Sequence, residues 1–382
     1  MLESPLRPTI PLQRCRVTPL ASRYHHCIHA YHGVDAWSRT GDYLLYIGFD
    51  DEQCCDIVMR DLDNAEETSL AHTTIFDYHT AAHHRWVLGD SAVLFYTAVD
   101  DKRCPALVEV ARPGRPEPLT DLAGLSVRHV MPGGETAYGS RRLDGRDTVQ
   151  RISLRAGTTE TLLTIDHVLD AFPDDFPGRD LGWHFSHPVP NADESMLFVK
   201  FQRPRPWDHS GPVGAINWGG FLVLDLHNGA LRNFGCRISG HPFWMNDNRT
   251  ILNIKNPLDG SDNRWLVLVD ALTGENIRLV DQPIEGPGHP SQSPTGELVV
   301  TDAFTFDGQH SPIYLIDLRS GTSREIVRLQ HRFNPKGDGY NPHHIERGQP
   351  HPIWSPDGQQ ILVNCNHKSE RMQLLILDHF YS

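Results

Sequence analysis

The histidines are the residues of this sequence whose chemistry is most informative. The chain has 23 of them among 382 residues, which is far above ordinary usage. Four of them stand directly before a proline. The segments that they open read HPVP from 187, HPFW from 241, HPSQ from 289 and HPIW from 351. Neutral imidazole is the commonest metal ligand and a general base near neutral pH. If these positions meet in space, they form a metal site or a catalytic imidazole cluster.

The segments that begin at these histidines follow one repeated pattern. Each has a short strand, a tight turn and a buried second strand, as in HPIWSPDGQQILVNCN at 351–366, where Pro356, Asp357 and Gly358 form the turn. Copies recur at intervals of roughly 40 to 60 residues, a length typical of β-propeller blades. The seven copies open at Val34, His83, Val127, His187, His241, His289 and His351.

This repeat predicts an all-β fold, a seven-bladed β-propeller of four-stranded antiparallel blades that forms a single domain over residues 1–382. The last copy lacks a fourth strand, so we expect the N-terminal segment around Cys15–Thr18 to complete the last blade and cover its open edge. The innermost strands surround the central channel, so the blade-opening histidines should converge there. An all-β sandwich with accidental similarity between segments is the alternative.

Composition excludes several classes of function. The net charge of -13 argues against binding nucleic acid or a polybasic attachment to membranes, since phosphate surfaces would repel the chain. No apolar run approaches the length of a membrane span, and the N-terminus has no apolar core of a secretory signal. The seven cysteines contain no CxxC pair, so we expect a reduced, cytoplasmic protein. The oligomeric state stays open.

Three imidazoles with one oxygen ligand suit a divalent first-row metal such as Mn, Fe, Ni or Zn. Gln349 stands two residues before His351, and in an extended segment both side chains point the same way. Glu346, His343 and His344 are further candidate ligands. The alternative interpretation is that polar residues simply face a water-filled channel and have no function.

From about residue 180 onward the chain resembles the oligogalacturonate lyases, which are cytoplasmic seven-bladed propeller enzymes. The segment LGWHFSHPVPNADESMLF matches the one that carries their catalytic base, which implies that role for His187. HPFWMND matches a metal-ligand segment at His241, and RGQPHPIWSPD partly matches a Gln-x-x-His-Pro-His-Pro run. In that run His351 stands at the position of the second histidine and Gln349 at the position of the first histidine. Glu346 stands at the position of the glutamine. The resemblance implies a manganese site, and we expect His289 to complete the ligand set.

The activity implied by the resemblance is β-elimination on a short, anionic uronate oligosaccharide. His187 takes the C5 proton, the C4 oxygen leaves, and the metal neutralises the C6 carboxylate. We expect Lys200, Arg203 and Arg205 to bind a second carboxylate, because arginine can do so through two N–H groups. The alternative for these three residues is a solvated loop.

An N-terminal cluster is a rival catalytic centre. It looks like the His and Tyr sites of propeller lyases that act on ulvan or rhamnosyl-glucuronate linkages without an obligatory metal at the base step. Two further classes stay open, namely a propeller that only binds a partner and a hydrolase or epimerase with the same metal. The absence of a GxSxG motif disfavours a serine hydrolase. The rival cluster consists of Tyr24, His25, His26, His29, Tyr31, His32, Tyr78, His79, His83 and His84.

Overall fold

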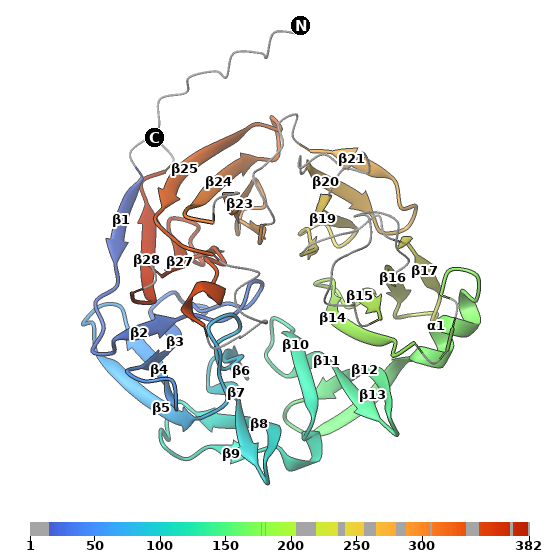
Figure 1. Cartoon of the computed structure of the whole chain (residues 1–382), viewed down its shortest axis with the longest axis horizontal. Helices are drawn as coiled ribbons and strands as arrows, with labels where there is room; N and C mark the ends of the chain where they lie inside the picture. The colour runs from blue at the N-terminus through green and yellow to red at the C-terminus, as the bar shows by residue number, and fades with distance from the viewer. Residues whose placement is uncertain are drawn as a thin grey trace, which may run out of the picture.

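The computed structural model describes residues 15–176, 178–179, 181–203, 219–235, 241–255, 265–279, 288–305, 308–333, 344–366 and 370–380. Within these residues the strands form seven four-stranded antiparallel sheets arranged as a ring around a central channel (Figure 1). The predicted seven-bladed β-propeller is therefore confirmed.

Six blades take their strands in chain order from the channel outward, and blade 7 takes its outermost strand from the start of the described chain. Blades 1 and 2 contain β2 (His26–Ile28), β3 (Tyr43–Phe49), β4 (Cys55–Asp61), β5 (Glu67–Thr73), β6 (Arg85–Val87), β7 (Ala92–Val99), β8 (Lys102–Glu109) and β9 (Glu117–Pro118). Blades 3 and 4 contain β10 (Leu125–Val130), β11 (Thr136–Leu143), β12 (Arg146–Ser153), β13 (Thr158–Thr164), β14 (His184–Pro190), β15 (Met196–Gln202), β16 (Gly219–Asp225) and β17 (Leu231–Asn233).

Blades 5 and 6 contain β18 (Phe243–Trp244), β19 (Thr250–Lys255), β20 (Trp265–Asp270), β21 (Asn276–Arg278), β22 (Ser291–Gln292), β23 (Leu298–Asp302), β24 (Ser311–Asp317) and β25 (Ser323–Leu329). Blade 7 contains β26 (Ile353–Trp354), β27 (Ile361–Cys365), β28 (Gln373–Asp378) and β1 (Arg16–Pro19). The short helix α1 (Ile165–Ala171) connects blades 3 and 4, and no helix of the described residues is long and apolar enough to cross a membrane.

The ring closes through a strand from the start of the described chain. β1 pairs antiparallel with β28, with Arg16 opposite Asp378 (Figure 1). The Arg16 Nε donates to Asp378 Oδ1 at 2.8 Å, and the Leu20 N–H donates to the Leu374 carbonyl at 2.9 Å. The prediction that an N-terminal strand completes the last blade is therefore confirmed. This pairing covers a sheet edge that would otherwise be open to association.

Apolar packing lies between the blades and not in the channel. Seven clusters of buried side chains each join two neighbouring blades, as where Ile57 of blade 1 shares a cluster with Phe95 of blade 2. Three tryptophans add a hydrogen bond across an interface, from the indole N–H to a carbonyl of the preceding blade. The pairs are Trp86 with Ala36, Trp244 with Val189 and Trp354 with Ser291, at 3.1, 2.8 and 3.0 Å.

The backbone at three blade openings has a positive φ, which side chains other than glycine rarely adopt. The φ values are 52° at His83, 55° at His187 and 45° at His351. At His187 the pairing of β14 with β15 also skips from Ser186 to Val189, which is a β-bulge. Bulges re-aim side chains. The local backbone therefore directs these imidazoles differently from a regular strand residue.

Replacing Thr18 with proline should destabilise the ring closure. The Leu20 N–H points to β28, so by antiparallel alternation the Thr18 N–H does too and the Val17 N–H points outward. Thr18→Pro should lose one ladder bond and lower the free energy of unfolding by about 1–3 kcal/mol. Val17→Pro is the matched control and should stay near wild type in urea unfolding. Equal destabilisation by both variants would contradict this closure.

Candidate functional site

The blade-opening histidines of blades 4 to 7 lie close together across the channel. Ring centroids are 4.2 Å apart for His241 and His289, 4.4 Å for His289 and His351, and 6.2 Å for His187 and His241. Gln349 Oε1 lies 3.2 Å from His351 Nε2, a separation that two ligands of one metal ion could have. The structure thus brings all four residues predicted as metal ligands, and the predicted base, into one cluster.

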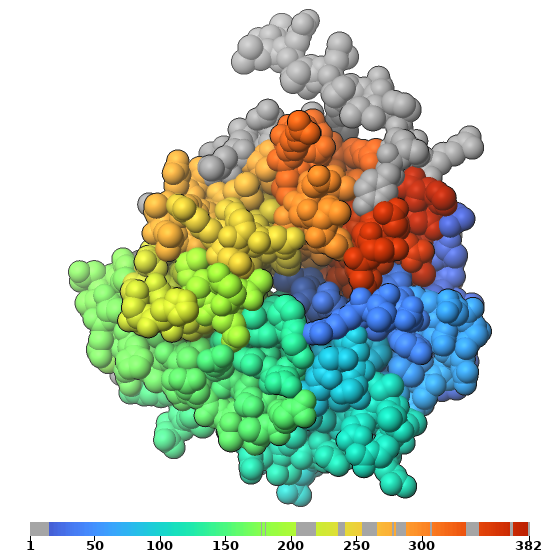
Figure 2. Space-filling view, turned by 180° about the vertical axis from the view of Figure 1, so that it is seen from behind, coloured from blue at the N-terminus to red at the C-terminus, as the bar shows by residue number. Residues whose placement is uncertain are grey.

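The loop between β2 and β3 enters this cluster. The ring of Tyr31 lies 4.9 Å from that of His351 and 6.3 Å from those of His187 and His289. His32 lies 4.7 Å from His241. Figure 2 shows the face opposite to that in Figure 1, with a hollow at its centre and N-terminal residues (blue) deep inside it. A segment from the start of the propeller therefore occupies the channel.

The N-terminal histidines divide between two places in the structure. His32 and His79 belong to the channel cluster, since His79 lies 5.4 Å from His351. His26 lies elsewhere and stacks on Phe49 at 4.9 Å. The sequence interpretation missed this union because the first blade opens at Val34, and no repeat marks His32 two residues earlier.

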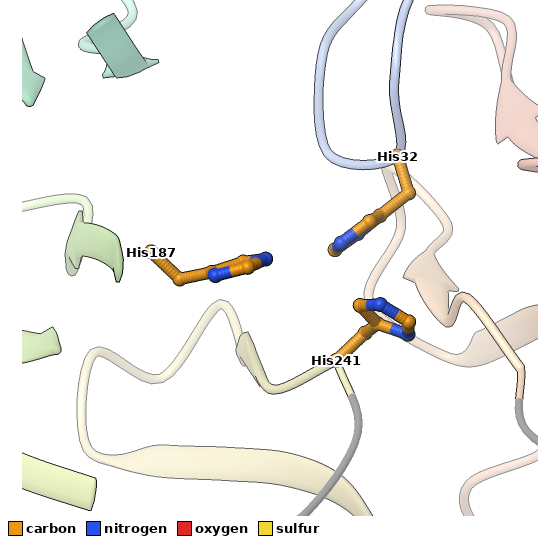
Figure 3. A group of neighbouring side chains, drawn as sticks. All are labelled: His32, His187 and His241. Carbon is orange, nitrogen blue, oxygen red and sulfur yellow. The ribbon is translucent and has the colours of Figure 1, made fainter. Parts of the chain in front are cut away.

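One group of three histidines could hold a metal ion among the described residues. The candidate ligand atoms of His32, His187 and His241 all lie within 4.8 Å of one another. Figure 3 shows His32 and His187 pointing toward each other, with His241 beside them. This group shares His241 with the predicted ligand set. It differs in containing His187, which we predicted as the base, and His32, which the predicted ligand set lacks.

Asp302 orients the His289 ring. The Asp302 carboxylate oxygens lie 3.0 and 2.9 Å from His289 Nδ1, and both residues are almost fully buried. The carboxylate accepts, so Nδ1 carries the hydrogen and Nε2 is the ring nitrogen left for another partner. Likewise His241 Nδ1 lies 3.3 Å from the Gly288 carbonyl. Metal-ligating histidines typically donate their second ring N–H in this way.

Buried nitrogen atoms without a hydrogen-bond partner gather in the channel. Among the described residues they include His289 Nε2, His351 Nδ1, His32 Nδ1 and both ring nitrogens of His187. Leaving a buried donor or acceptor unsatisfied costs about 1–3 kcal/mol. A divalent cation would satisfy several lone pairs at once. Imidazole nitrogens and amide oxygens are ligand types that a first-row divalent ion accepts.

Burial keeps three of the blade-opening imidazoles neutral. It lowers the pKa of His187, His241 and His351 well below the usual value, and nearby cations or other histidines lower each pKa further. Neutral imidazole is the form that binds a metal and accepts a proton. Burial, assisted by Arg128, also lowers the pKa of Lys200 to about 7. Lys200 lies opposite Ser186 on the neighbouring strand, next to His187.

The remaining predicted residues have different positions. Arg203 is partly buried and follows β15, whereas Arg205 and His343 lie outside the described residues. His344 is exposed and caps the short 3-10 helix Ile345–Arg347, where its Nδ1 accepts from the Glu346 N–H at 3.2 Å. These geometries leave the roles of Arg203 and Glu346 as predictions.

A cavity of about 300 Å³ adjoins His187, lined by the N-terminal loop and blades 2 to 4. Arg128 projects into it, with its guanidinium 4.2 Å from the Tyr31 ring centroid and Nη2 2.9 Å from His32 Nε2. Guanidinium only donates, so His32 Nε2 accepts. We did not predict Arg128 because blade 3 opens at Val127. A bulge between Val127 and His129 gives the next residue its own direction.

Comparison with known proteins shows likeness in structure only. No family model and no curated protein matches this sequence. An oligogalacturonate lyase in complex with manganese superposes with a TM-score of 0.69 at 20% identity, covering 95% of this chain and 93% of that one. An oligogalacturonate lyase from Vibrio parahaemolyticus gives 0.68 at 14% identity, with the same coverages. A prolyl endopeptidase gives 0.53 at 11% identity, covering 96% of this chain and 50% of that one. The expected resemblance to oligogalacturonate lyases is thus confirmed for the fold.

Acid should unfold this protein through its buried histidines. Burial lowers the pKa of His29 and His331 to about 4 and of His84 to about 3. The unfolded chain binds these protons near pH 6.5 and the folded chain does not, so stability falls as pH drops from about 6.5 to about 4. Each histidine should cost about 2 kcal/mol between pH 7 and pH 5.

Urea unfolding at the two pH values measures this loss. His84→Gln should reduce the loss of unfolding free energy between pH 7 and pH 5 by about 2 kcal/mol, the contribution of one buried histidine. His227→Gln, at an exposed position, should leave that loss unchanged. An unfolding free energy that is the same at pH 7 and pH 5 in the wild type would contradict the buried neutral imidazoles.

Proposed function

We propose that this chain is a metal-dependent lyase that cleaves short uronate oligosaccharides by β-elimination. The observation that carries the proposal is the position of His187. It is a neutral imidazole with buried, unpartnered nitrogens, and it lies between a histidine cluster and a cavity that contains Arg128. The fold likeness to oligogalacturonate lyases, one of them in complex with manganese, supports the same reaction class.

His241, His289, His351 and Gln349 would hold the metal ion, which we propose to be Mn²⁺, with Ni, Fe and Zn as alternatives. The orientation of His289 by Asp302 and the 3.2 Å separation of Gln349 Oε1 from His351 Nε2 support this set. When bound, the ion would supply positive charge to the C6 carboxylate of the sugar and so make the C5 proton easier to remove.

His187 is the proposed general base for the C5 proton. Its neutral state at pH 7 follows from burial and from the positive charges of Lys200 and Arg128. Those charges also oppose the imidazolium that forms when the proton is taken. The carboxylates of a bound uronate offset them, so the base works best with its substrate in place. Lys200, Arg203 and Arg205 remain the proposed contacts of a second carboxylate.

We place the reaction in the cytoplasm. The six described cysteines are free thiols, which supports a reducing compartment. The proposed partner is the small anionic oligosaccharide substrate alone, without nucleic acid or membrane.

A metal-independent elimination by histidine and tyrosine is the second candidate function, of the kind proposed for ulvan or rhamnosyl-glucuronate substrates. One observation favours it. Tyr31 lies inside the cluster, 5.0 Å from His79 and 4.9 Å from His351, with Arg128 over its ring. Such a site would keep its activity in the presence of a chelator.

Lyase activity is tested by absorbance near 235 nm on digalacturonate, trigalacturonate and an oligoglucuronate, because β-elimination creates a conjugated C4=C5 bond. With Mn²⁺ present, His187→Ala should lower kcat by about 10²–10⁴-fold, the contribution of a general base. His227→Ala, at an exposed position on blade 4, is the matched control and should keep full activity. Chelator should abolish the signal.

Other outcomes separate the alternatives. Activity that survives the chelator but is lost in Tyr31→Phe favours the metal-independent lyase. Absence of any 235 nm signal on all three substrates favours a hydrolase, an epimerase or a propeller that only binds, and would falsify the lyase proposal.

Metal affinity distinguishes the two overlapping ligand sets. If Asp302 orients a ligand, Asp302→Asn should weaken Mn²⁺ binding by about 10–100-fold, and His289→Ala should weaken it further. His32→Ala should leave the affinity nearly unchanged. Equilibrium dialysis with elemental analysis measures all three variants. The reverse ranking, with His32→Ala the most damaging, would assign the metal to His32, His187 and His241 instead.

A further inference from the structure

Two arginines of blades 2 and 3, of which Arg128 lines the cavity, have no carboxylate partner among the described residues. Arg85 is 4% exposed and donates only to carbonyl oxygens, those of His83, Val127 and Arg128. Arg128 contacts Tyr31 and His32. No carboxylate of the described ranges forms an ion pair with either guanidinium. This local excess of positive charge occurs in a chain whose net charge is -13.

Burial makes these cations costly. It lowers the pKa of Arg128, and it lowers the pKa of Arg85 to about 10, with Arg128 as a further cause. A buried charge without a counter-ion is strongly unfavourable, and a carboxylate from outside the chain would relieve that cost. The cavity is where such a carboxylate could reach Arg128, since Arg128 is one of its lining residues.

The other lining groups suit a sugar. Hydroxyl groups line the same cavity as Arg128, and hydroxyls both donate to and accept from sugar hydroxyls. The volume of about 300 Å³ is at the lower end of small-molecule sites and suits one ring better than a long chain. The guanidinium has five N–H groups and bonds His32 and Tyr31, so further donors can face a carboxylate. The hydroxyl residues are Thr80, Ser126, Ser140 and Ser186.

We propose that this cavity is a carboxylate-binding subsite for a single uronate ring and that Arg128 binds the carboxylate. The choice of a uronate as ligand rests on the proposed function, but binding at this subsite requires no metal. The guanidinium lies over the Tyr31 ring, 4.2 Å from its centroid, and this contact restrains the group that would meet the carboxylate. The ring bound here would lie next to His187, which lines the same cavity.

The test is calorimetric titration of the chelator-treated full chain with D-galacturonate and with D-galactose, its neutral counterpart. Wild type should bind the acid at least tenfold more tightly than the neutral sugar. Arg128→Gln should lose this preference, and Arg128→Lys should keep part of it because charge remains without the planar fork. The matched control is Arg142→Gln in the same blade, where an exposed arginine bonds the Gly145 carbonyl. It should behave as wild type.

Equal binding of both sugars by wild type, or an unchanged preference in Arg128→Gln, overturns the proposal. Because Arg128 also contacts the N-terminal loop, a second variant guards against misfolding. Ser126→Asp places a carboxylate in the cavity at a position that is now solvent-exposed. It should raise the thermal unfolding temperature and abolish the preference for the acid. A lower unfolding temperature with the preference retained would also overturn it.

This experiment separates the subsite from the reaction. Acid-selective binding that depends on Arg128, without any 235 nm product, would support the subsite and refute the lyase. If the protein forms the 235 nm product but its preference for the acid survives Arg128→Gln, the lyase is supported and the subsite is refuted.

Discussion

Closing seven sheets into a ring leaves a channel that the blades themselves cannot fill with apolar side chains. In this protein the N-terminal loop and the blade openings fill it with imidazoles, a tyrosine and a guanidinium. These groups are polar and buried, so each nitrogen needs a partner or remains a cost. The unpartnered nitrogens of His187, His289 and His351 are such a cost among the described residues.

Burial affects the histidines and the arginines of the channel in opposite ways. It holds the histidines neutral, which frees lone pairs for a metal ion or a proton. It also destabilises the cations Arg85 and Arg128, which cannot lose their charge near neutral pH. A site with neutral ligands on one side and an unbalanced guanidinium on the other favours an anionic ligand that bridges them.

Stability and chemistry occupy separate parts of the molecule. The apolar clusters and the indole hydrogen bonds lie between blades, and β1 closes the ring at its outer edge. Half of a prolyl endopeptidase chain superposes on this fold as oligogalacturonate lyases do, so the fold alone does not fix a function. Function in such a frame has to be inferred from the channel residues.

The sequence alone determined the seven blades, the closing strand and the convergence of His187, His241, His289 and His351, because each is tied to a repeated pattern and repeats occupy equivalent places in a ring. Only the tertiary structure decided that Tyr31, His32 and His79 enter the same cluster. They lie in connections that do not repeat, and chain path cannot be derived there from periodicity. The direction of the Arg128 side chain likewise depends on the β-bulge between Val127 and His129. That bulge is defined by the pairing of β10 with β11, so it cannot be read from the sequence.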